Sequence, residues 1–497
     1  MNNRPEVLNI PNAIWKIILG FTAFRLLLAI ILPLTPQEAY YWSWSRELAL
    51  SYFDHPPLAS YSIWITTNIF GQTGFGIKIA AALWFLGLNI IWARLIQEMF
   101  GNTKQTLWTI LALNSTIVFE LYGFVITPDT PLIFAWTACI YSLWRLISSE
   151  DYKWWYVAGF FMGLAWLGKY SGIMLVPSIL MFFLISRQQR KWLLTPHPYL
   201  GVLVALLAFS PVLIWNSQHD WVSFAFQGSR RTSDMGIWKP RFFGELLGSQ
   251  FFVLGPYLFV LVFASVIRFG KKIFSNLEDK ILLLLCSGFI TTLFFVSISF
   301  RSLVKMNWLA PAYWSFIILG IYHLIDKPQR IRRMQIGIYS SLVFLGIGVS
   351  VVALPDVPLG EGNTWSGWKT AAEEVQVIRD SLRIEDEEYF IFSTNYKASS
   401  LLKFYLSDQP RTYAQDIIGK HALQFDIWPK DEQLVGKTGI LVVDDRREYR
   451  FKPKKIEPYF EEIDKLSTIN VRNYGQSVRR IEIYLCKNYK GLGEDTI

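Results

Sequence analysis

The sequence predicts an α-helical polytopic membrane protein with a soluble α/β domain at its C-terminal end. Three observations predict this fold class. Of the 497 residues, 52% are apolar and 16% aromatic, while 18% are charged, against about 25% charged residues in soluble globular proteins. Apolar runs close to the roughly 20 residues that cross a bilayer follow one another up to residue 354. Beyond this point the composition is that of a soluble domain.

The charges divide at the same place and argue against a nucleic-acid partner. The net charge of +9 combines +12 over residues 1–354 with −3 over residues 355–497. The positive excess lies in the apolar part, where the loops of a membrane protein explain it. We therefore expect a transmembrane domain at 1–354 and an extracytoplasmic α/β domain at 355–497, with membrane lipid and no nucleic acid as partners.

Eleven apolar runs are predicted to be transmembrane helices of a plasma (inner) membrane protein. The basic clusters between them fall on one side if the N-terminus is cytoplasmic, which is the positive-inside pattern. An odd number of spans then places the C-terminal domain outside. The runs are 14–34, 75–99, 105–124, 131–148, 154–168, 170–186, 199–215, 249–268, 280–299, 309–326 and 334–354.

Two predicted outer loops, 35–74 and 216–248, are too long to be simple turns. In the first, residues 40–53 and 58–70 combine Trp and Tyr with apolar residues at three- and four-residue spacing. This pattern predicts helices at the membrane interface. An aromatic belt that only anchors the loop is the alternative.

The C-terminal region alternates between helix and strand patterns. Residues 366–383 and 397–406 predict helices, and 388–393, 439–445 and 479–486 predict strands. This order is typical of a small α/β domain. Several aromatic residues could stack on a sugar, but we prefer core packing as their explanation: Tyr396, Phe404, Tyr405, Phe425 and Trp428.

The first outer loop places Glu38, Asp54 and His55 just beyond the first span. Ionisable groups at a membrane boundary are costly to desolvate and commonly have a task there. Pro56 and Pro57 stiffen the backbone and remove two amide donors, so they would hold a carboxylate and an imidazole at a fixed angle. A solvated loop with an ordinary turn explains the same residues without a function.

Further candidates lie in the other outer segments. Asp129, flanked by prolines, suits catalysis and equally suits the N-cap of the following helix. Lys169, between two short spans, would pair with a phosphate or extend to the membrane interface. Outer basic residues run against the positive-inside trend and together suggest an anionic ligand such as a lipid phosphate. They are Arg230, Arg231, Lys239, Arg241, Arg301 and Lys305.

Several nucleotide and metal motifs are absent from the sequence. There is no Walker A loop, no Rossmann GxGxxG, no HExxH and no paired CxxC. An ATP-driven pump or a zinc protease of those types is therefore not expected. We expect no cofactor and no dedicated metal site, and leave open a divalent cation shared by Glu38 and Asp129.

Five segments, in this order, resemble bacterial membrane glycosyltransferases of the GT-C class. They are similar to family 39-type enzymes, which are related to dolichyl-phosphate-mannose protein mannosyltransferases and to the aminoarabinose transferase of lipid A. The resemblance implies GT-C architecture, a polyprenyl-phosphate-linked sugar donor, and a lipid, glycan or protein acceptor on the extracytoplasmic face. The segments are QEAYYWSWS (37–45), YFDHPPL (52–58), ITPDTPLIF (126–134), GLAWLGKYSG (163–172) and VKMNWLAPAYW (304–314).

The resemblance also implies a mechanism, an inverting single displacement. A carboxylate takes the proton of the attacking acceptor hydroxyl, and cations hold the departing phosphate. The family's first-loop motif is usually Asp followed by Glu. Here it reads Gln37-Glu38, so either Glu38 or Asp54 would supply the base.

The remaining roles are carried over residue by residue from the same resemblance. Asp129 matches the family's second conserved acid. Asp54-His55 matches an acidic-basic pair near the lipid phosphate, in which His55 replaces a lysine. The expected phosphate-binding residues are His55, Lys169, Arg301 and Lys305, and the residues expected to organise the acceptor or its loops are Tyr40, Tyr41 and Asn307.

A transporter or flippase of a lipid-linked sugar is the main alternative, since it too would need outer cations and a polytopic core. Transporters often show repeated halves, and this sequence shows no repeat. A glycan-binding scaffold is a third interpretation, but eleven spans exceed what an anchor needs. We therefore prefer the glycosyltransferase.

Overall fold

The computed structural model describes residues 10–232, 238–275, 277–325, 328–353, 367–382, 389–429, 434–445, 453–473 and 476–492. The chain forms two compact units. The first, here called the helical unit, comprises Met1–Ile31 and Ala49–Val349. The second, here called the mixed unit, comprises Leu32–Leu48 and Ser350–Ile497. Each unit is described by itself.

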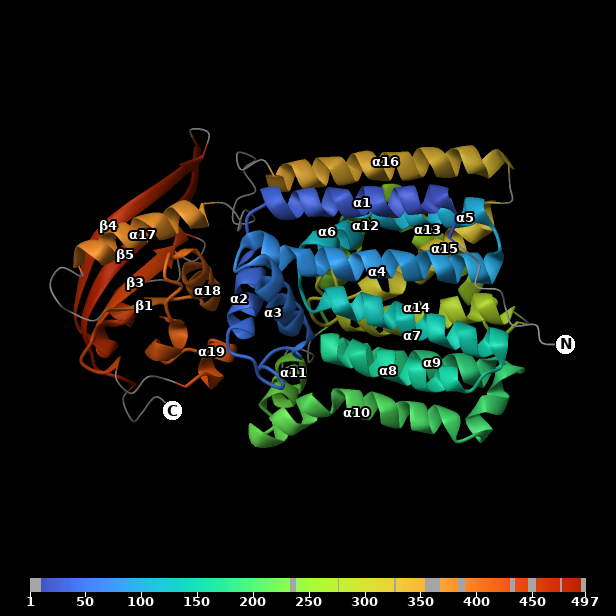
Figure 1. Cartoon of the computed structure of the whole chain (residues 1–497), viewed down its shortest axis with the longest axis horizontal. Helices are drawn as coiled ribbons and strands as arrows, with labels where there is room; N and C mark the ends of the chain where they lie inside the picture. Colours follow the sequence, from blue (N-terminus) through green and yellow to red (C-terminus); the bar gives the residue numbers. More distant parts are fainter. Residues whose placement is uncertain are drawn as a thin grey trace. The chain divides into compact units, whose positions relative to one another are not determined.

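Long helices lie side by side in the helical unit (Figure 1). The short 3-10 helices η1 (Tyr170–Met174) and η2 (Gln189–Leu194) precede and follow α9. The helices are α1 (Asn12–Ile31), α3 (Leu58–Phe70), α4 (Gly74–Phe100), α5 (Thr103–Asn114), α6 (Ile117–Phe124), α7 (Asp129–Ser149), α8 (Lys153–Gly168), α9 (Leu175–Ile185), α10 (His197–Gln218), α11 (Val222–Thr232), α12 (Arg241–Leu254), α13 (Pro256–Gly270), α14 (Asp279–Ser299), α15 (Ala310–Ile325) and α16 (Pro328–Ala353).

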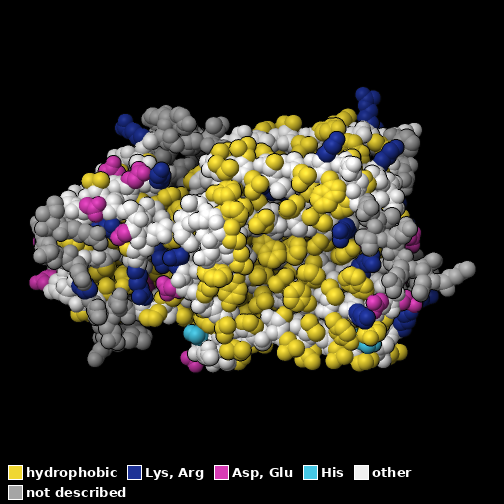
Figure 2. Space-filling view, viewed as in Figure 1, with side chains coloured by type: hydrophobic (Ala, Val, Ile, Leu, Met, Phe, Trp, Pro, Cys, Tyr) yellow, Lys and Arg dark blue, Asp and Glu magenta, His cyan; other side chains and the backbone are white. Residues whose placement is uncertain are grey.

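The helical unit has the surface of a membrane protein. Figure 2 shows hydrophobic side chains over its middle and several Lys and Arg side chains near one end. Large exposed apolar residues such as Ile69, Leu207 and Val343 suit contact with lipid tails. Among the described residues, five helices are long and apolar enough to cross a membrane, or seven if each of two bent pairs is one span.

Both bent pairs occur where the sequence predicts one continuous span, and neither 105–124 nor 249–268 is one continuous helix. Within 249–268, α12 and α13 meet at 116°. Gly255 sits between them with φ +78, a conformation that glycine adopts freely, and Pro256 starts the new helix. Within 105–124, α5 and α6 meet at 72°, and the Thr116 hydroxyl caps α6 by accepting the Phe119 N–H.

The structure confirms only one of the two helices that the sequence predicts at the membrane interface. The second is confirmed as a helix, α3. The first is not a helix over 40–53, since α2 begins at Pro36 and ends at Ser45. A capping box fixes this start: the Thr35 hydroxyl accepts the Glu38 N–H at 3.1 Å, and Glu38 Oε2 accepts the Thr35 N–H at 2.9 Å.

Small residues let α8 and α10 pack closely in the helical unit. A Cβ added to Gly159 would lie 2.1 Å from the Gly201 carbonyl oxygen, and one added to Gly163 would lie 2.6 Å from the Ala205 carbonyl oxygen. Membrane helices commonly associate through such small residues spaced four apart, because van der Waals packing replaces the hydrophobic effect there. The pair therefore forms a fixed wall of the bundle.

The mixed unit contains a five-stranded sheet in the order β2-β1-β3-β5-β4, which confirms an α/β region at the C-terminal end. β1 pairs in parallel with β2 and β3, while β5 pairs antiparallel with β3 and β4. The sequence patterns missed the two-residue β2 and the long β4. The elements are α2 (Pro36–Ser45), α17 (Trp368–Leu382), β1 (Tyr389–Ser393), α18 (Tyr396–Tyr405), β2 (Thr412–Tyr413), α19 (Gln424–Ile427), β3 (Thr438–Asp444), β4 (Phe460–Asn473) and β5 (Gln476–Tyr489).

Apolar side chains cover both faces of this sheet. On one face α17 and α18 bury Val375 and Leu401 against Ile440 and Ile483. On the other, aromatic rings cluster around Phe392. Helix α2 shares the first core through Ala39, so a segment of the first predicted loop folds with the C-terminal sheet.

Replacing Gly159 with alanine should destabilise the helical unit, because the added Cβ would overlap the Gly201 carbonyl oxygen. Overpacking of this kind costs about 1–3 kcal/mol, and thermal unfolding of the purified protein in detergent would show a lower midpoint. Gly20→Ala is the matched control, since nothing lies within 4 Å of a Cβ there. Equal midpoints for the two variants would show that α8 and α10 are not in close contact.

Candidate active site

Asp129 is the first residue of α7 and is held there by its neighbour Thr130. The Thr130 hydroxyl lies 3.3 Å from the carbonyl oxygens of both Tyr122 and Val125, which ties the start of α7 to the end of α6. The N-cap position belongs to Pro128, which provides no side-chain hydrogen bond. The Asp129 carboxylate is thus not the cap of its own helix and bonds elsewhere.

Its partners are Lys169 and Asn307. The Lys169 ammonium donates to Asp129 Oδ1 at 2.8 Å and to Oδ2 at 2.9 Å, and Asn307 Nδ2 donates to Oδ2 at 2.8 Å. The side chains of Lys169 and Asp129 are only 9% and 6% exposed. Charge-assisted hydrogen bonds of this length are among the stronger polar contacts in proteins. We call these three residues the Asp129 cluster.

The cluster joins three parts of the helical unit that are far apart in the sequence. Asp129 starts α7, and Lys169 sits in extended conformation between α8 and η1. Asn307 lies in the turn before α15. Because the carboxylate oxygens already accept three N–H donors, Asp129 is suited to holding Lys169 and Asn307 in place. Proton transfer would require it to give up one of these contacts.

A pocket lies beside the cluster, and it gathers polar side chains on aromatic walls. Lys169 and His55, both singled out from the sequence, line it together. Two rings 5.3 Å apart, those of Phe295 and Trp308, form an apolar wall. The other lining residues, which the sequence analysis did not select, are Tyr170, Ser171 and Gln227. Lysine, glutamine and serine side chains are all hydrogen-bond donors, so the pocket suits an anion.

The two long predicted loops meet at this pocket. Helix α11 packs on residues 52–54, with Ser223 Oγ donating to the Tyr52 carbonyl at 2.9 Å and Gln227 Nε2 donating to the Asp54 carbonyl at 2.8 Å. Asp54 Oδ2 lies 3.9 Å from His55 Nε2, and its side chain is 10% exposed. A carboxylate and an imidazole are thus held side by side next to Lys169.

The other predicted basic residues occupy different positions. Arg301 and Lys305 are exposed, on the turn that carries Asn307, and are not among the residues that line the pocket. The Lys239 backbone N–H donates to the Phe300 carbonyl at 2.7 Å, which brings part of the second loop to the same turn. The side chains of Arg230 and Arg231 lie outside the described part of the structure.

Glu38, Tyr40 and Tyr41 belong to the mixed unit. Glu38 completes the capping box of α2, and burial, with a smaller contribution from the Glu38 carboxylate, raises the pKa of Tyr405. The Tyr40 hydroxyl accepts the Gln424 N–H at 3.1 Å. The Tyr41 ring lies 5.0 Å from that of Trp44. Each residue therefore has a structural role within its own unit.

The C-terminal aromatic residues pack in the same way. The Tyr40 ring lies 4.8 Å from that of Tyr396, and the Trp42 ring lies 5.1 Å from that of Phe404. Phe425 and Trp428 are 4.9 Å apart. These contacts agree with core packing as their explanation.

A second buried ion pair lies at the bend between α5 and α6. Arg25 of α1 and Glu120 of α6 approach to 2.8 Å, and both side chains are 0% exposed. Arg25 also donates to Asn114 at the end of α5, whose amide donates to Asn89 Oδ1 at 2.7 Å. The pair therefore bridges the bend between α5 and α6, and α6 leads directly to the segment that carries Asp129.

Metal ligands do not cluster in the described residues, where no group of three or more His, Cys, Asp or Glu is placed to hold an ion. A cation bound by fewer protein ligands therefore stays an open expectation.

Comparisons with a protein family and with individual proteins all relate this chain to glycosyltransferases. Residues 54–215 match the dolichyl-phosphate-mannose-protein mannosyltransferase family. The chain is 24% identical over 338 residues to the lipid A galacturonosyltransferase RgtD of Rhizobium johnstonii, covering 66% of this chain and 69% of that protein. It is 24% identical over 192 residues to an undecaprenyl phosphate-alpha-4-amino-4-deoxy-L-arabinose arabinosyl transferase of Pseudomonas fluorescens, covering 37% of this chain and 35% of that protein.

Solved structures show the same fold over almost the whole chain. ArnT from Cupriavidus metallidurans in the apo state aligns with a TM-score of 0.65 at 14% identity, covering 95% of this chain and 97% of ArnT. The crystal structure of the same protein bound to undecaprenyl phosphate aligns with a TM-score of 0.62 at 15% identity and the same coverage. The likeness establishes an ArnT-like fold.

A double-mutant cycle should reveal the coupling within the Asp129 cluster. Asp129→Asn leaves a buried ammonium without its carboxylate, and Lys169→Met leaves a buried carboxylate without its ammonium; each loss costs about 3–5 kcal/mol. The double variant should be less destabilised than the sum of the two, as measured by thermal unfolding in detergent. Strict additivity of the two losses would show that the two side chains do not interact.

Glu120→Gln should also lower the unfolding midpoint, because it leaves the Arg25 guanidinium buried without a carboxylate partner, at a cost of about 3–5 kcal/mol. Glu150→Gln removes the partner of Lys191 from an exposed pair and should change stability by only about 0–1 kcal/mol. Similar midpoints for both variants would contradict a structural role for the buried pair.

Proposed function

We propose that this chain, a membrane glycosyltransferase related to the dolichyl-phosphate-mannose-protein mannosyltransferases and to the lipid A glycosyltransferases, transfers a sugar from a polyprenyl-phosphate donor to an acceptor hydroxyl. The observation that carries the proposal is the pocket lined by Lys169 and His55 beside the Asp129 cluster. The arabinosyl transferase relative is named for an undecaprenyl phosphate donor, and ArnT has been solved with undecaprenyl phosphate.

In this proposal the pocket holds the donor phosphate. The Lys169 ammonium has three N–H donors, and Asp129 fixes its direction. The Lys169–Asp129 pair is electrically neutral as a whole, so a phosphate needs further positive charge. Protonated His55 is offset by the Asp54 carboxylate 3.9 Å away and acts as a further hydrogen-bond donor, so exposed Arg301 and Lys305 supply the net positive potential. These donors stabilise the charge that grows on the phosphate as the glycosyl bond breaks.

The chemical step is a single displacement. The acceptor oxygen forms a bond to the anomeric carbon while the bond from that carbon to the phosphate oxygen breaks, and polyprenyl phosphate leaves. We assign the proton of the acceptor hydroxyl to Asp54, which adjoins His55 in the same unit as Lys169. The alternative base is Glu38, and the anomeric configuration inverts in either case.

The proposal includes the topology that the sequence predicts. Five long apolar helices, the bent pairs α5–α6 and α12–α13 counted as one span each, and the two shorter apolar helices at Tyr170–Ile185 and Ala310–Ile325 give nine crossings. Eleven result if α8 and α16 cross as well. Lys and Arg at the far ends of α7 and α8, such as Arg145 and Lys153, mark the cytoplasmic side. Asp129 and Lys169 then face the extracytoplasmic side of the membrane. In this proposal the acceptor, a lipid similar to lipid A, binds from that side.

The two candidate bases can be separated by two conservative variants. Asp54→Asn should lower the transfer rate by about 10²–10⁴-fold, the usual contribution of a general base, at unchanged donor affinity. Glu38→Gln should keep α2 folded, because Gln also serves in a capping box, and should retain activity. Transfer is measured with purified protein, a radiolabelled polyprenyl-phosphate sugar and envelope lipid extract.

The opposite pattern, with Glu38→Gln inactive and Asp54→Asn active, would move the base to Glu38. The reaction itself is tested by mass spectrometry of a deletion strain. Accumulation of one polyprenyl-phosphate sugar together with loss of that sugar from an envelope lipid supports transfer. Confinement of the accumulated donor to the cytoplasmic leaflet would contradict it and indicate a flippase.

A further inference from the structure

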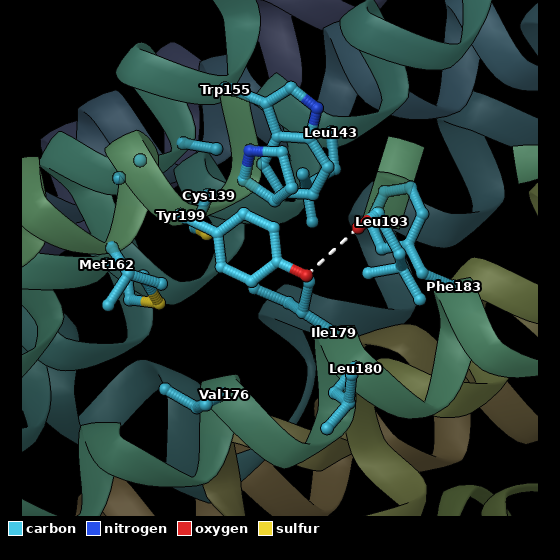
Figure 3. A pocket seen from close by; sticks show the side chains of 15 residues that line it. Cys139, Leu143, Trp155, Met162, Val176, Ile179, Leu180, Phe183, Leu193 and Tyr199 are labelled. Carbon is cyan, nitrogen blue, oxygen red and sulfur yellow. Dashed lines mark hydrogen bonds between the residues drawn. The ribbon is translucent and has the colours of Figure 1, made fainter. Parts of the chain in front are cut away.

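An apolar groove lies in the helical unit away from the Asp129 cluster. It is formed by α7, α8, α9, α10 and η2, is open on one side, and has about 650 Å³ of space between and in front of its walls, open solvent included. Figure 3 shows its side chains, with the Tyr199 ring across the view. The Tyr199 hydroxyl donates to the Leu193 carbonyl at 2.9 Å, so this polar atom is satisfied by the protein and the lining is hydrocarbon.

The groove has a structural cause. Close packing at Gly159 and Gly201 fixes α8 against α10, while α9 is only 11 residues long and follows the 3-10 turn η1. The short helix leaves space that its neighbours do not fill. Leu180, Tyr199 and Val202, which are 47%, 64% and 38% exposed, form the mouth of the groove on the lipid-facing surface.

Distance separates this groove from the proposed donor site. Trp155, Gly159 and Met162 line the groove, and they precede Lys169 by 14, 10 and 7 residues along α8. At about 1.5 Å per helical residue the separation is roughly 10–21 Å. Since the hydrocarbon core is about 30 Å thick, the groove extends from near the middle of the membrane into the half opposite to Lys169. A chain that enters its mouth comes from the leaflet on that side.

Basic residues at the start of α8 and in η2 form a positively charged rim beside the groove. Lys153 begins α8 two residues before Trp155, and Arg190 and Lys191 precede Leu193 in η2; all three cations are exposed. The nearby acids are Glu150, which pairs with Lys191 at 2.6 Å, Asp151, and Asp279, which accepts hydrogen bonds from Ser186 and Gln189. With Arg187 included, the described residues 150–153 and 187–191 have four cations and two acids, and Asp279 is a third acid beside them, so the rim has a net charge of +1.

We infer that this groove is a binding site for an anionic phospholipid of the leaflet opposite to the donor site, with one acyl chain in the groove and the headgroup on the Lys153–Arg190–Lys191 rim. Basic pockets between membrane helices bind anionic lipid head groups in this way. The hydrocarbon lining matches an acyl chain, and the charge of the rim selects the headgroup. The site is independent of the proposed transfer reaction.

Native mass spectrometry of the full-length protein tests the inference. The protein is delipidated in detergent and then exposed to vesicles of phosphatidylglycerol or of phosphatidylcholine. We expect one phosphatidylglycerol retained per chain, with at least about tenfold lower retention of phosphatidylcholine, which corresponds to about 1.4 kcal/mol. Equal retention of the two lipids, or retention of neither, would overturn the inference.

Two sets of variants locate the site. Leu180→Trp with Val202→Trp fills the mouth and should lower phosphatidylglycerol retention about tenfold, whereas the control Leu83→Trp, on an exposed apolar position of α4, should not. Lys153→Gln with Lys191→Gln changes only exposed side chains, keeps the hydrogen bonds from Arg190 to the Leu184 carbonyl, and should abolish the preference for phosphatidylglycerol. Unchanged retention in the filled variant, or an unchanged preference in the rim variant, contradicts the assignment.

Discussion

The contact of Lys169 and Asn307 with the Asp129 carboxylate is the constraint on which the arrangement of the site depends. A buried charge without a partner is strongly unfavourable, so the start of α7, the segment between α8 and η1, and the turn before α15 are held at one point. The pocket follows directly from this, because Tyr170, Ser171 and Trp308 are sequence neighbours of the cluster residues. The same contact that stabilises the fold therefore shapes the pocket.

Helix breaks position the polar residues of the helical unit. Backbone groups released at a break within a membrane must be satisfied by protein or by a water-filled cavity. Lys169 lies between α8 and η1, and Arg25 and Glu120 flank the bend between α5 and α6. Buried ion pairs at these breaks specify their geometry. The continuous faces of the helices remain apolar, as the groove between α8, α9 and α10 illustrates.

The sequence predicted a membrane protein, an α/β region at the C-terminal end, and the segments that supply His55, Lys169 and Trp308 to the pocket. Hydropathy and the order of motifs are local signals, so they can be recognised without the structure. The sequence did not predict that Lys169 pairs with Asp129, since that contact spans 40 residues and depends on packing. Gln227 carried no signal, because its role comes from α11 folding onto Asp54. The bend at Gly255 and the membership of α2 in the mixed unit are likewise set by tertiary structure.

Recognition of a lipid-linked phosphate by the pocket beside Asp129 is the central claim. The most direct measurement is the binding of polyprenyl phosphate and of uncharged polyprenol to the purified protein, with Lys169→Met as the comparison. The account predicts tight binding of polyprenyl phosphate by the wild-type protein, at least about tenfold weaker binding of polyprenol (about 1.4 kcal/mol), and loss of this difference in the variant. Equal affinity of the wild-type protein for the two lipids would contradict it.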